Sequence, residues 1–231
     1  MKFTKMQGLG NDYVYVNCLE SIPENAEKLA VKISDRHFGV GSDGLILICS
    51  SDIADFKMVM YNADGSVSEM CGNGIRCVGK YVRDKGLTDK DEISVETGAG
   101  IKYLKFHREN GETKLITVDM GAPILNGLDI PTVFDKNPVV AEPIEVDGVT
   151  YKTTCVSMGN PHSVVFLDKD TDLKAFDIDG IGSKFESHPA FPRRVNAEFA
   201  KVIKPGLLEM RVYERGTAET LACGTGTCAT H

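Results

Sequence analysis

The sequence predicts a protein of mixed helices and strands, of the α/β or α+β class, built as two domains of similar fold. Short apolar runs typical of strands alternate with a few helical segments. A cysteine in a glycine-rich turn occurs twice, at Cys71 and Cys223, and a Gly-Asn pair before an apolar run occurs twice, ending at Asn11 and Asn160. The separations are 223 − 71 = 152 and 160 − 11 = 149 residues. The register therefore holds across half of the chain, which indicates an internal repeat.

This repeat predicts two pseudo-symmetric domains, residues 1–117 carrying Cys71 and residues 118–231 carrying Cys223. We expect each domain to be a mainly antiparallel sheet or barrel wrapped around a central helix. We also expect a pseudo-twofold axis to relate the domains, with the equivalent turns facing each other. An active site would then lie in the cleft between them.

Apolar runs predict the strands of the first half. They lie at residues 12–18, 45–49, 56–61, 93–96, 101–106 and 115–119. The first of them follows a glycine-rich turn at 8–11, and Asn110-Gly111 is a strong signal for a hairpin between the last two.

Two helices are expected in this half. The first spans residues 24–37, because Pro23 suits a helix start and Gly39 a helix end. The second runs from Gly72 to about residue 85, with apolar residues on one face and Gly86 as its stop.

The second half shows the same succession of elements. Strands are predicted at 139–146, 150–157, 163–167, 195–203 and 208–213. Residues 174–186 are ambiguous and allow a short helix. A further helix is expected to begin after Cys223, and the sequence stops a few residues into it, at His231. We therefore expect this domain to be truncated at its C-terminal end, since so short a helix does not complete a core.

Composition excludes several classes of function. An apolar content of 42% supports a packed core, but no stretch is long enough to span a membrane. The net charge of −7 comes from interspersed acids and bases, which argues against nucleic acid as a partner. No apolar run follows the N-terminal lysines, so we expect no secretory signal and read the seven cysteines as thiols in a reducing cytoplasm.

A cysteine at a helix start has distinctive chemistry. Unpaired backbone N–H groups there stabilise a thiolate and lower the pKa of the thiol. The adjacent glycines allow a ligand to approach the backbone, whose amides can bind a carboxylate. Two such turns holding one substrate, one sulfur as thiolate and the other as thiol, could remove a proton from one face of a carbon and supply one to the other. The pattern predicts a two-base racemase or epimerase that needs no cofactor.

Plainer interpretations exist for each residue taken alone. Cys18, Cys49 and Cys155 are typical of buried apolar positions, and Cys77 and Cys228 are expected to pack near the helix starts. Zinc is disfavoured because the spacings are C-x5-C and C-x4-C, whereas zinc sites show tighter pairs, so we predict no metal. A single asparagine is usually a turn or cap residue, and His162 alone could be a loop histidine.

The combined motifs resemble the diaminopimelate epimerase family over both halves. They are Gly10-Asn11-Asp12, Asn62-Ala63-Asp64-Gly65-Ser66, Cys71-Gly72-Asn73-Gly74-Ile75-Arg76-Cys77, Gly159-Asn160-Pro161-His162, Asn196-Ala197-Glu198-Phe199, Glu214-Arg215-Gly216 and Ala222-Cys223-Gly224-Thr225-Gly226. The family interconverts L,L- and meso-2,6-diaminopimelate without pyridoxal phosphate or metal, in lysine and peptidoglycan precursor synthesis. Its members are typically cytoplasmic homodimers.

The resemblance also implies roles for individual residues. Cys71 and Cys223 would be the catalytic base and acid, supported by His162 and Glu214 as further catalytic residues. Backbone amides would hold the carboxylate at the reacting carbon, from the pairs Gly72-Asn73 and Gly224-Thr225. The remaining substrate-binding residues would be Asn11, Asn62, Asn160, Asn196, Glu214 and Arg215, with Arg215 the partner of the distal carboxylate and Glu214 that of an ammonium group.

One departure and two alternatives remain open. Many members of the family carry Gln where this chain has Gly44, so that position is left out of the predicted site. An epimerase of the proline racemase type would use similar paired turns, but typically with His in place of Asn73. A thiol redox protein or a metal-binding protein would use the same cysteines for different chemistry.

Overall fold

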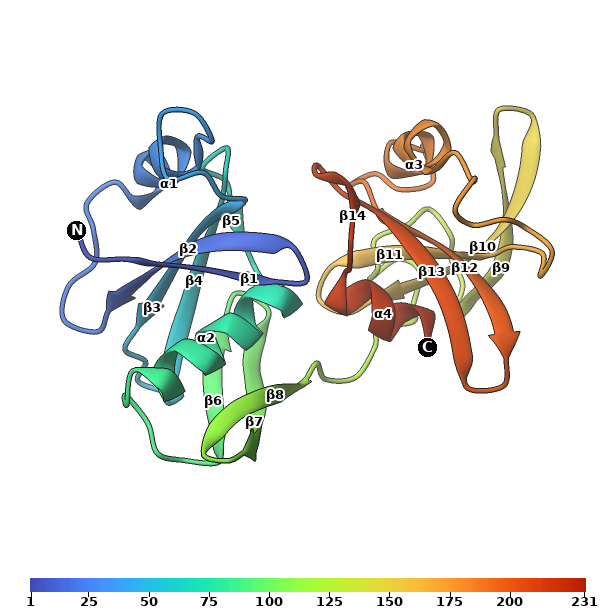
Figure 1. Cartoon of the computed structure of the whole chain (residues 1–231). Helices are drawn as coiled ribbons and strands as arrows, with labels where there is room; N and C mark the ends of the chain where they lie inside the picture. The colour runs from blue at the N-terminus through green and yellow to red at the C-terminus, as the bar shows by residue number, and fades with distance from the viewer. The chain divides into compact units, whose positions relative to one another are not determined.

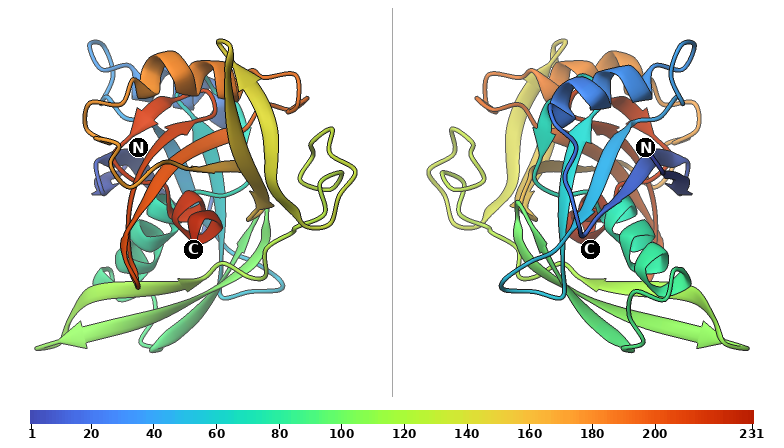
Figure 2. Two further views of the ribbon diagram at one scale, coloured as in Figure 1. Left: turned by 90° about the vertical axis from the view of Figure 1, so that its right-hand side faces the viewer. Right: turned by 90° about the vertical axis from the view of Figure 1, so that its left-hand side faces the viewer.

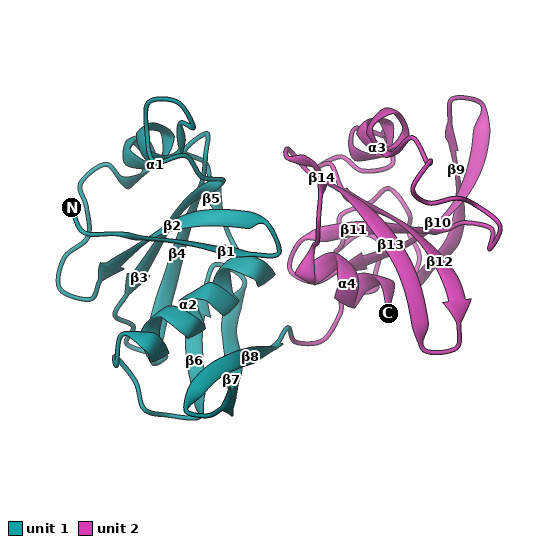
Figure 3. Cartoon of the chain, in the orientation of Figure 1, with its two compact units in different colours: residues 1–120 teal, residues 121–231 magenta.

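The computed structural model describes residues 1–231, and the chain forms two compact units (Figure 3). Unit 1 comprises Met1–Met120 and unit 2 comprises Gly121–His231. Each contains one sheet and two helices, so the prediction of a mixed α and β fold is confirmed. The units divide three residues after the boundary predicted at 117, because the last strand of unit 1 continues to Asp119.

Unit 1 is an eight-stranded sheet with a helix on each face (Figure 1). The strands pair in the order β1-β2-β3-β4-β6-β7-β8, with β5 paired to β4. Only the pairs β2/β3 and β4/β6 are parallel. The elements are β1 (Thr4–Gly8), β2 (Asn11–Cys18), α1 (Ala26–Ser34), β3 (Gly44–Cys49), β4 (Phe56–Asn62), β5 (Val67–Ser68), α2 (Gly72–Asp84), β6 (Glu92–Thr97), β7 (Gly100–Glu109) and β8 (Glu112–Asp119).

The alternation of side chains along a strand gives this sheet two apolar faces. Val14 and Leu45 point to one face and pack under α1, through its buried residues Ala30 and Ile33. Their neighbours Tyr15 and Ile46 point to the other face and pack under α2 (Figures 1 and 2). The strands β6 and β7 extend this second core, so the sheet curves around α2 as expected for a central helix.

Unit 2 repeats much of this plan in a six-stranded sheet. Its order is β14-β13-β12-β11-β10-β9, and only β11/β12 is parallel. The elements are β9 (Val139–Val146), β10 (Val149–Ser157), β11 (Pro161–Phe166), α3 (Ile178–Glu186), β12 (Asn196–Lys204), β13 (Leu207–Glu214), β14 (Ala218–Thr220) and α4 (Gly224–Thr230). The apolar core of this unit lies on the face of the sheet that carries α3, around Phe185 and Phe199.

An offset of 152 residues relates most elements of the two units. It takes the first residue of α1, Ala26, to the first residue of α3, Ile178. It likewise takes the last residue of β4, Asn62, to the last residue of β13, Glu214. In both units a helix joins two parallel strands, a short strand follows, and a second helix begins at Gly72 or Gly224. The segment from β1 to α2 therefore shares its topology with the segment from β10 to α4, as the repeat predicts.

The prediction of a helix over 24–37 is wrong at both ends. Asn25 adopts a left-handed conformation, with φ 51°, and α1 starts only at Ala26. At the other end Asp35 leaves the helical region, and its carboxylate accepts the backbone N–H groups of His37 and Phe38. The ambiguous segment 174–186 contains the helix α3 in its second half. No helix in the structure is long and apolar enough to cross a membrane.

Two leucines on neighbouring strands test this description of the unit 1 core. Leu104 on β7 is fully buried, whereas Leu115 on β8 is 69% exposed. We expect Leu104→Ala to lower the free energy of unfolding by about 2–5 kcal/mol, because it leaves a cavity beneath α2. The matched control Leu115→Ala should change it by no more than roughly 0.5 kcal/mol. Urea denaturation of the full chain measures both, and equal losses would contradict the assigned core.

Candidate active site

The strand topology of unit 1 brings predicted site residues to one edge of its sheet. Asn11 begins β2, and Gly44 begins the parallel strand β3. Asn62 ends β4, which runs antiparallel to β3 and pairs with it at Gly44. The start of α2 lies against the same edge, since Cys71 contacts Asn11. Residues from four parts of the chain therefore meet at one place within unit 1.

Cys71 is held in place by hydrogen bonds to a backbone amide and to Asn11. It is the N-cap of α2, and its sulfur accepts the backbone N–H of Gly74 at 3.2 Å. Its thiol donates to Asn11 Oδ1, also at 3.2 Å, and the amide of Asn11 donates in turn to Asp43 Oδ2 at 2.8 Å. The side chain is half-buried. The structure thus brings Cys71 and Asn11 together, as a shared site requires.

Two other predicted residues of unit 1 are placed by local contacts. The Asn73 side chain is buried, and its Oδ1 accepts from the Arg76 guanidinium at 2.6 Å. The same guanidinium donates to the carbonyl of Gly72. At the other end of the site the Asn62 amide donates to the hydroxyl of Ser66, which closes the turn after β4. The first turn of α2 is therefore braced by Arg76.

Gly44 is a glycine because no side chain fits there. A Cβ atom at this position would lie 2.1 Å from the carbonyl oxygen of Tyr61 and 2.8 Å from the ring of Tyr13. A glutamine could occupy this position only if the pairing of β3 with β4 changed. Gly44 accordingly contributes close strand packing at the sheet edge and no side chain to the candidate site.

Unit 2 forms the equivalent edge from different residues. Asn160 precedes β11, Asn196 begins the parallel strand β12, and Glu214 ends β13. The Asn196 amide donates to the carbonyl of Pro161 at 2.9 Å, and its Oδ1 accepts the backbone N–H of Arg215 at 2.9 Å. Asn196 therefore links the ends of three strands at this edge.

Cys223 occupies the position in unit 2 that Cys71 occupies in unit 1. It is the N-cap of α4, and its sulfur lies 3.3 Å from both the backbone nitrogen of Gly226 and the hydroxyl of Thr225. The thiol is 5% exposed. Burial raises the pKa of Cys223, and the nearby carboxylates of Glu214 and Glu198 raise it further. The expectation of a pKa lowered by the helix start is wrong here, because the amide of Gly226 and the Thr225 hydroxyl oppose these larger effects without cancelling them.

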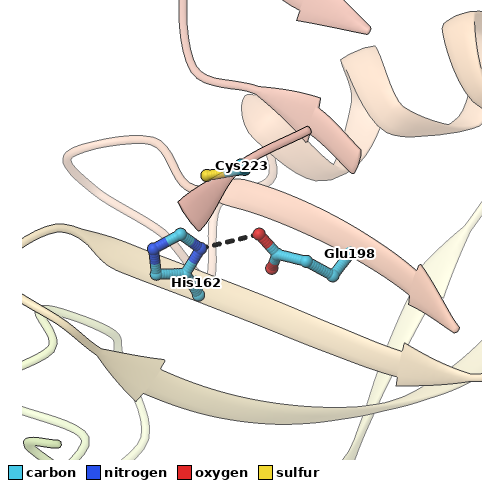
Figure 4. Close-up of side chains that lie close together, drawn as sticks. All are labelled: His162, Glu198 and Cys223. Atoms are coloured by element: carbon cyan, nitrogen blue, oxygen red, sulfur yellow. Dashed lines mark hydrogen bonds and ion pairs between the residues drawn. The ribbon is translucent and has the colours of Figure 1, made fainter. Parts of the chain in front are cut away.

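His162 lies in a buried chain of polar groups beside this thiol. Its Nδ1 lies 2.6 Å from Glu198 Oε1, and its Nε2 lies 3.0 Å from Asn160 Oδ1. The side chains of His162 and Glu198 are wholly buried. A ring nitrogen of His162 and a carboxylate oxygen of Glu198 each lie within 4.8 Å of the Cys223 sulfur (Figure 4). His162 is thus a core histidine with defined partners. It links Asn160, a predicted site residue, to Glu198.

Sequence reasoning did not single out Glu198 as a site residue. Burial raises the pKa of its carboxyl group, and the attraction of His162 opposes that change. The offset of 198 − 46 = 152 makes it the counterpart of Ile46 in unit 1. Both lie under the helix start: a Cβ on Gly74 would come within 2.7 Å of Ile46, and one on Gly226 within 2.5 Å of Glu198. The repeat could have identified Glu198, because it places a glutamate at the position where unit 1 has a core isoleucine.

The remaining predicted residues of unit 2 lie at the same edge or beside it. Glu214 accepts a hydrogen bond from the Thr220 hydroxyl, and its charge acts on Cys223. Thr225 is buried beside the thiol, and Gly224 begins α4. The Arg215 side chain is exposed, and its guanidinium lies 3.3 Å from the carbonyl of Arg193. Arg215 is thus the predicted residue most open to solvent.

The other cysteines divide as packing predicts, with one exception. Cys18, Cys49, Cys77 and Cys155 are buried, and burial raises the pKa of each thiol. Cys228 is exposed, so the expectation that it packs near the helix start is wrong.

Known proteins resemble this chain in sequence over nearly its whole length. A family model described as diaminopimelate epimerase matches residues 3–125 and 154–231, which include every predicted site residue. The chain belongs to the diaminopimelate epimerase family. It is 59% identical over 229 residues to the diaminopimelate epimerase of Acetivibrio thermocellus, covering 99% of this chain and 81% of that protein. It is 56% identical over 237 residues to that of Agathobacter rectalis, covering 100% and 82%.

Solved structures with little sequence identity share the fold of this family member. A hydroxyproline epimerase from Agrobacterium vitis matches with a TM-score of 0.65 at 13% identity, over 98% of this chain and 74% of that one. A phenazine biosynthesis protein of the PhzF family from Enterococcus faecalis matches with a TM-score of 0.64 at 8% identity, over 100% and 80%. These likenesses agree with two domains of one topology.

The charge of Glu214 can be tested through the reactivity of Cys223. Because that carboxylate raises the pKa of the thiol, Glu214→Gln should lower the pKa and increase the thiolate fraction at a given pH. We expect iodoacetamide to modify Cys223 severalfold faster at pH 8, as measured by fragment-ion mass spectrometry, which separates Cys223 from Cys228. Glu219→Gln is the matched control. Glu219 pairs with Arg211 and is not among the groups that raise the pKa of Cys223. An unchanged or slower rate in Glu214→Gln would contradict the assignment.

Proposed function

We propose that this protein interconverts L,L- and meso-2,6-diaminopimelate by moving a proton at the α-carbon, with Cys71 and Cys223 as the acid–base pair. The observation that carries the proposal is the repeated N-cap cysteine, in a chain 59% identical to a protein named diaminopimelate epimerase. Each sulfur accepts the amide N–H of the third residue onward, and this fixed position at a helix start supports a role in proton transfer. The reaction is an isomerisation and needs no cofactor.

The chemical step conserves protons between substrate and enzyme. One cysteine, as thiolate, takes the proton from the α-carbon, so that a C–H bond breaks and an S–H bond forms. The other cysteine, as thiol, gives its proton to the opposite face of the same carbon and becomes the thiolate. The raised pKa of Cys223 favours its thiol form, which suits it to deliver a proton in one direction of the reaction.

The negative charge that develops at the α-carbon spreads into the adjacent carboxylate. Backbone amides at the starts of α2 and α4 would bind this carboxylate, from Gly72-Asn73 and Gly224-Thr225. The Arg76 contacts to Gly72 and Asn73 fix the first of these turns before substrate arrives. Preorganised donors of this kind stabilise the transition state without having to reorient.

The other end of the substrate carries a second amino group and a second carboxylate. Arg215 would bind the distal carboxylate through its exposed guanidinium, and Glu214 an ammonium group. Asn11, Asn62, Asn160 and Asn196 would supply further hydrogen bonds from the two sheet edges. His162 and Glu214 would support the cysteines, His162 through its buried contact with Glu198.

The wider setting follows from the same proposal. A diaminopimelate epimerase serves lysine and peptidoglycan precursor synthesis, and we propose that this one works in the cytoplasm as a homodimer. The basis for that compartment is the seven cysteines, none of which forms a disulfide in the structure.

A proline or hydroxyproline epimerase is the second candidate, because the hydroxyproline epimerase of Agrobacterium vitis shares the fold. Glu214 and Arg215 favour diaminopimelate, since proline offers no second charged end for them to bind. An assay of both substrates with the same protein separates the candidates, and turnover of proline alone would reject the proposal.

The acid–base pair is tested by serine variants and solvent deuterium. Cys71→Ser and Cys223→Ser should each lower kcat by about 10²–10⁴-fold, because a serine hydroxyl is a far weaker acid than a thiol. The unaltered enzyme in D2O should place deuterium on the α-carbon of the product epimer, as measured by NMR. Cys228→Ser, a change at an exposed cysteine of the same helix, is the control and should retain full activity. Near-normal turnover in either active-site variant would disprove the pairing.

The role of Arg215 predicts an effect on binding more than on chemistry. Arg215→Met removes the charge but keeps an unbranched side chain, and we expect KM for diaminopimelate to rise by about 10–100-fold with a smaller change in kcat. Arg193→Met, two residues before Val195 and also exposed, is the matched control and should leave KM unchanged. Steady-state kinetics measure both, and equal KM values for the two variants would remove Arg215 from the site.

A further inference from the structure

Three potential metal ligands lie together in unit 2 and come from three separate elements. His162 is on β11, Glu198 is on the neighbouring parallel strand β12, and Cys223 caps α4 (Figure 4). One nitrogen, one oxygen and one sulfur of this set all lie within 4.8 Å of one another. The three side chains are 0%, 0% and 5% exposed. Imidazole, carboxylate and thiolate are the groups that bind zinc in proteins.

A second observation points to a cation at this place. Glu198 Oε2 is buried and has no hydrogen-bond partner, although Oε1 of the same carboxyl group contacts His162. A buried polar atom without a partner is unfavourable, and native structures contain few of them. Across the repeat the same position holds Ile46, so the fold under a helix start does not require a carboxylate.

We propose that Cys223, His162 and Glu198 form an inhibitory binding site for a thiophilic divalent cation, with Zn²⁺ as the ion it fits. The three ligands leave a fourth position for water, as in open zinc sites. Zinc forms bonds of about 2.0–2.3 Å to nitrogen, oxygen and sulfur. The three ligand atoms, which lie within 4.8 Å of one another, must therefore move closer together when the ion binds. A change of side-chain torsions at Cys223 and Glu198 supplies that movement, with Oε2 the free oxygen.

The charges of the ion and its ligands balance. Binding breaks the S–H bond of Cys223 and displaces the proton shared by His162 and Glu198, and both protons go to solvent. The thiolate and carboxylate then carry two negative charges against the two positive charges of Zn²⁺, and the imidazole is neutral. No atom is oxidised or reduced. The cation thereby neutralises the carboxylate charge that otherwise disfavours the thiolate in this buried position.

The consequence for activity rests on the proposed function. A sulfur bound to zinc cannot deliver or accept a proton at the substrate, so the cation would switch off the Cys223 half of the reaction. Removal of the ion by a chelator would restore it. The cysteine of unit 1 has no equivalent pair, because its counterpart residues are Tyr13 and Ile46.

Cobalt binding tests the site independently of turnover. Co²⁺ added to the reduced, metal-free chain should bind at one ion per chain and give a thiolate-to-cobalt charge-transfer absorption, which Zn²⁺ then displaces. Cys223→Ser should abolish that absorption. Glu198→Gln should weaken binding by about 10–100-fold or more, since it removes a ligand charge. Cys71→Ser and Cys228→Ser are the matched controls and should leave the absorption intact. Circular dichroism checks that each variant is folded. If Glu198→Gln does not fold, Glu198→Ala is measured in its place.

The outcomes separate this inference from the proposed function. A charge-transfer band that survives Cys223→Ser, or that Cys71→Ser abolishes, would place the ion elsewhere and overturn the site. Absence of any band at millimolar Co²⁺ would overturn it as well. If cobalt binds at Cys223 but the chain does not epimerise diaminopimelate, the site stands and the proposed function falls. In the active enzyme, Zn²⁺ should inhibit turnover at the concentrations at which it displaces cobalt, and failure to inhibit would refute the regulatory role.

Discussion

The hydrogen bond from a helix amide to a cysteine sulfur constrains both candidate half-sites. In each unit the sulfur accepts the N–H of the glycine three residues later, at 3.2 Å in unit 1 and 3.3 Å in unit 2. That glycine lies so close to the sheet that a Cβ would come within 2.7 Å of Ile46 or 2.5 Å of Glu198. Cysteine, helix start and glycine are therefore fixed together, because the helix can begin over the strands only if this residue has no side chain. The repeated Cys-Gly-x-Gly motif therefore reflects the close packing of the helix on the sheet as well as the need for a cysteine at the helix start.

The same topology supports different environments for the two thiols. In unit 1 the counterpart positions beneath the helix start hold Tyr13 and Ile46, and the cysteine donates to an asparagine oxygen. In unit 2 they present His162 and Glu198, and the cysteine is almost wholly buried. Burial and nearby carboxylates make the Cys223 thiol a weaker acid than a free thiol. A two-base enzyme needs one sulfur protonated when the other is not, and unequal surroundings on an otherwise symmetric fold provide such a difference.

The repeat made most of the fold predictable, and the failures have local physical causes. A constant offset of 152 residues located both helix starts and the strand ends that carry Asn62 and Glu214. The strands β5 and β14 were missed because two or three residues are too few to show periodicity. The first helix was predicted too long, since Asn25 and Asp35 end it through backbone conformation, which apolar spacing does not reveal. Glu198 was missed because a glutamate in a strand is ordinarily a solvent-exposed residue of the alternating pattern. Its buried contact is with His162, 36 residues away, and the sequence does not show that the two meet.

The cost of burying Glu198 decides how it should be interpreted. Leaving one carboxylate oxygen without a partner in a protein interior costs about 1–3 kcal/mol, and a buried ion pair recovers little of the desolvation energy of its members. The related unit fills the equivalent position with isoleucine and has a continuous apolar core there. Stability alone would therefore favour an apolar residue at 198. The carboxylate is better explained by what it does to its neighbours, since it fixes one nitrogen of His162 and acts electrostatically on Cys223. A buried carboxylate that weakens the core and lies beside Cys223 supports the proposal that this thiol takes part in the reaction.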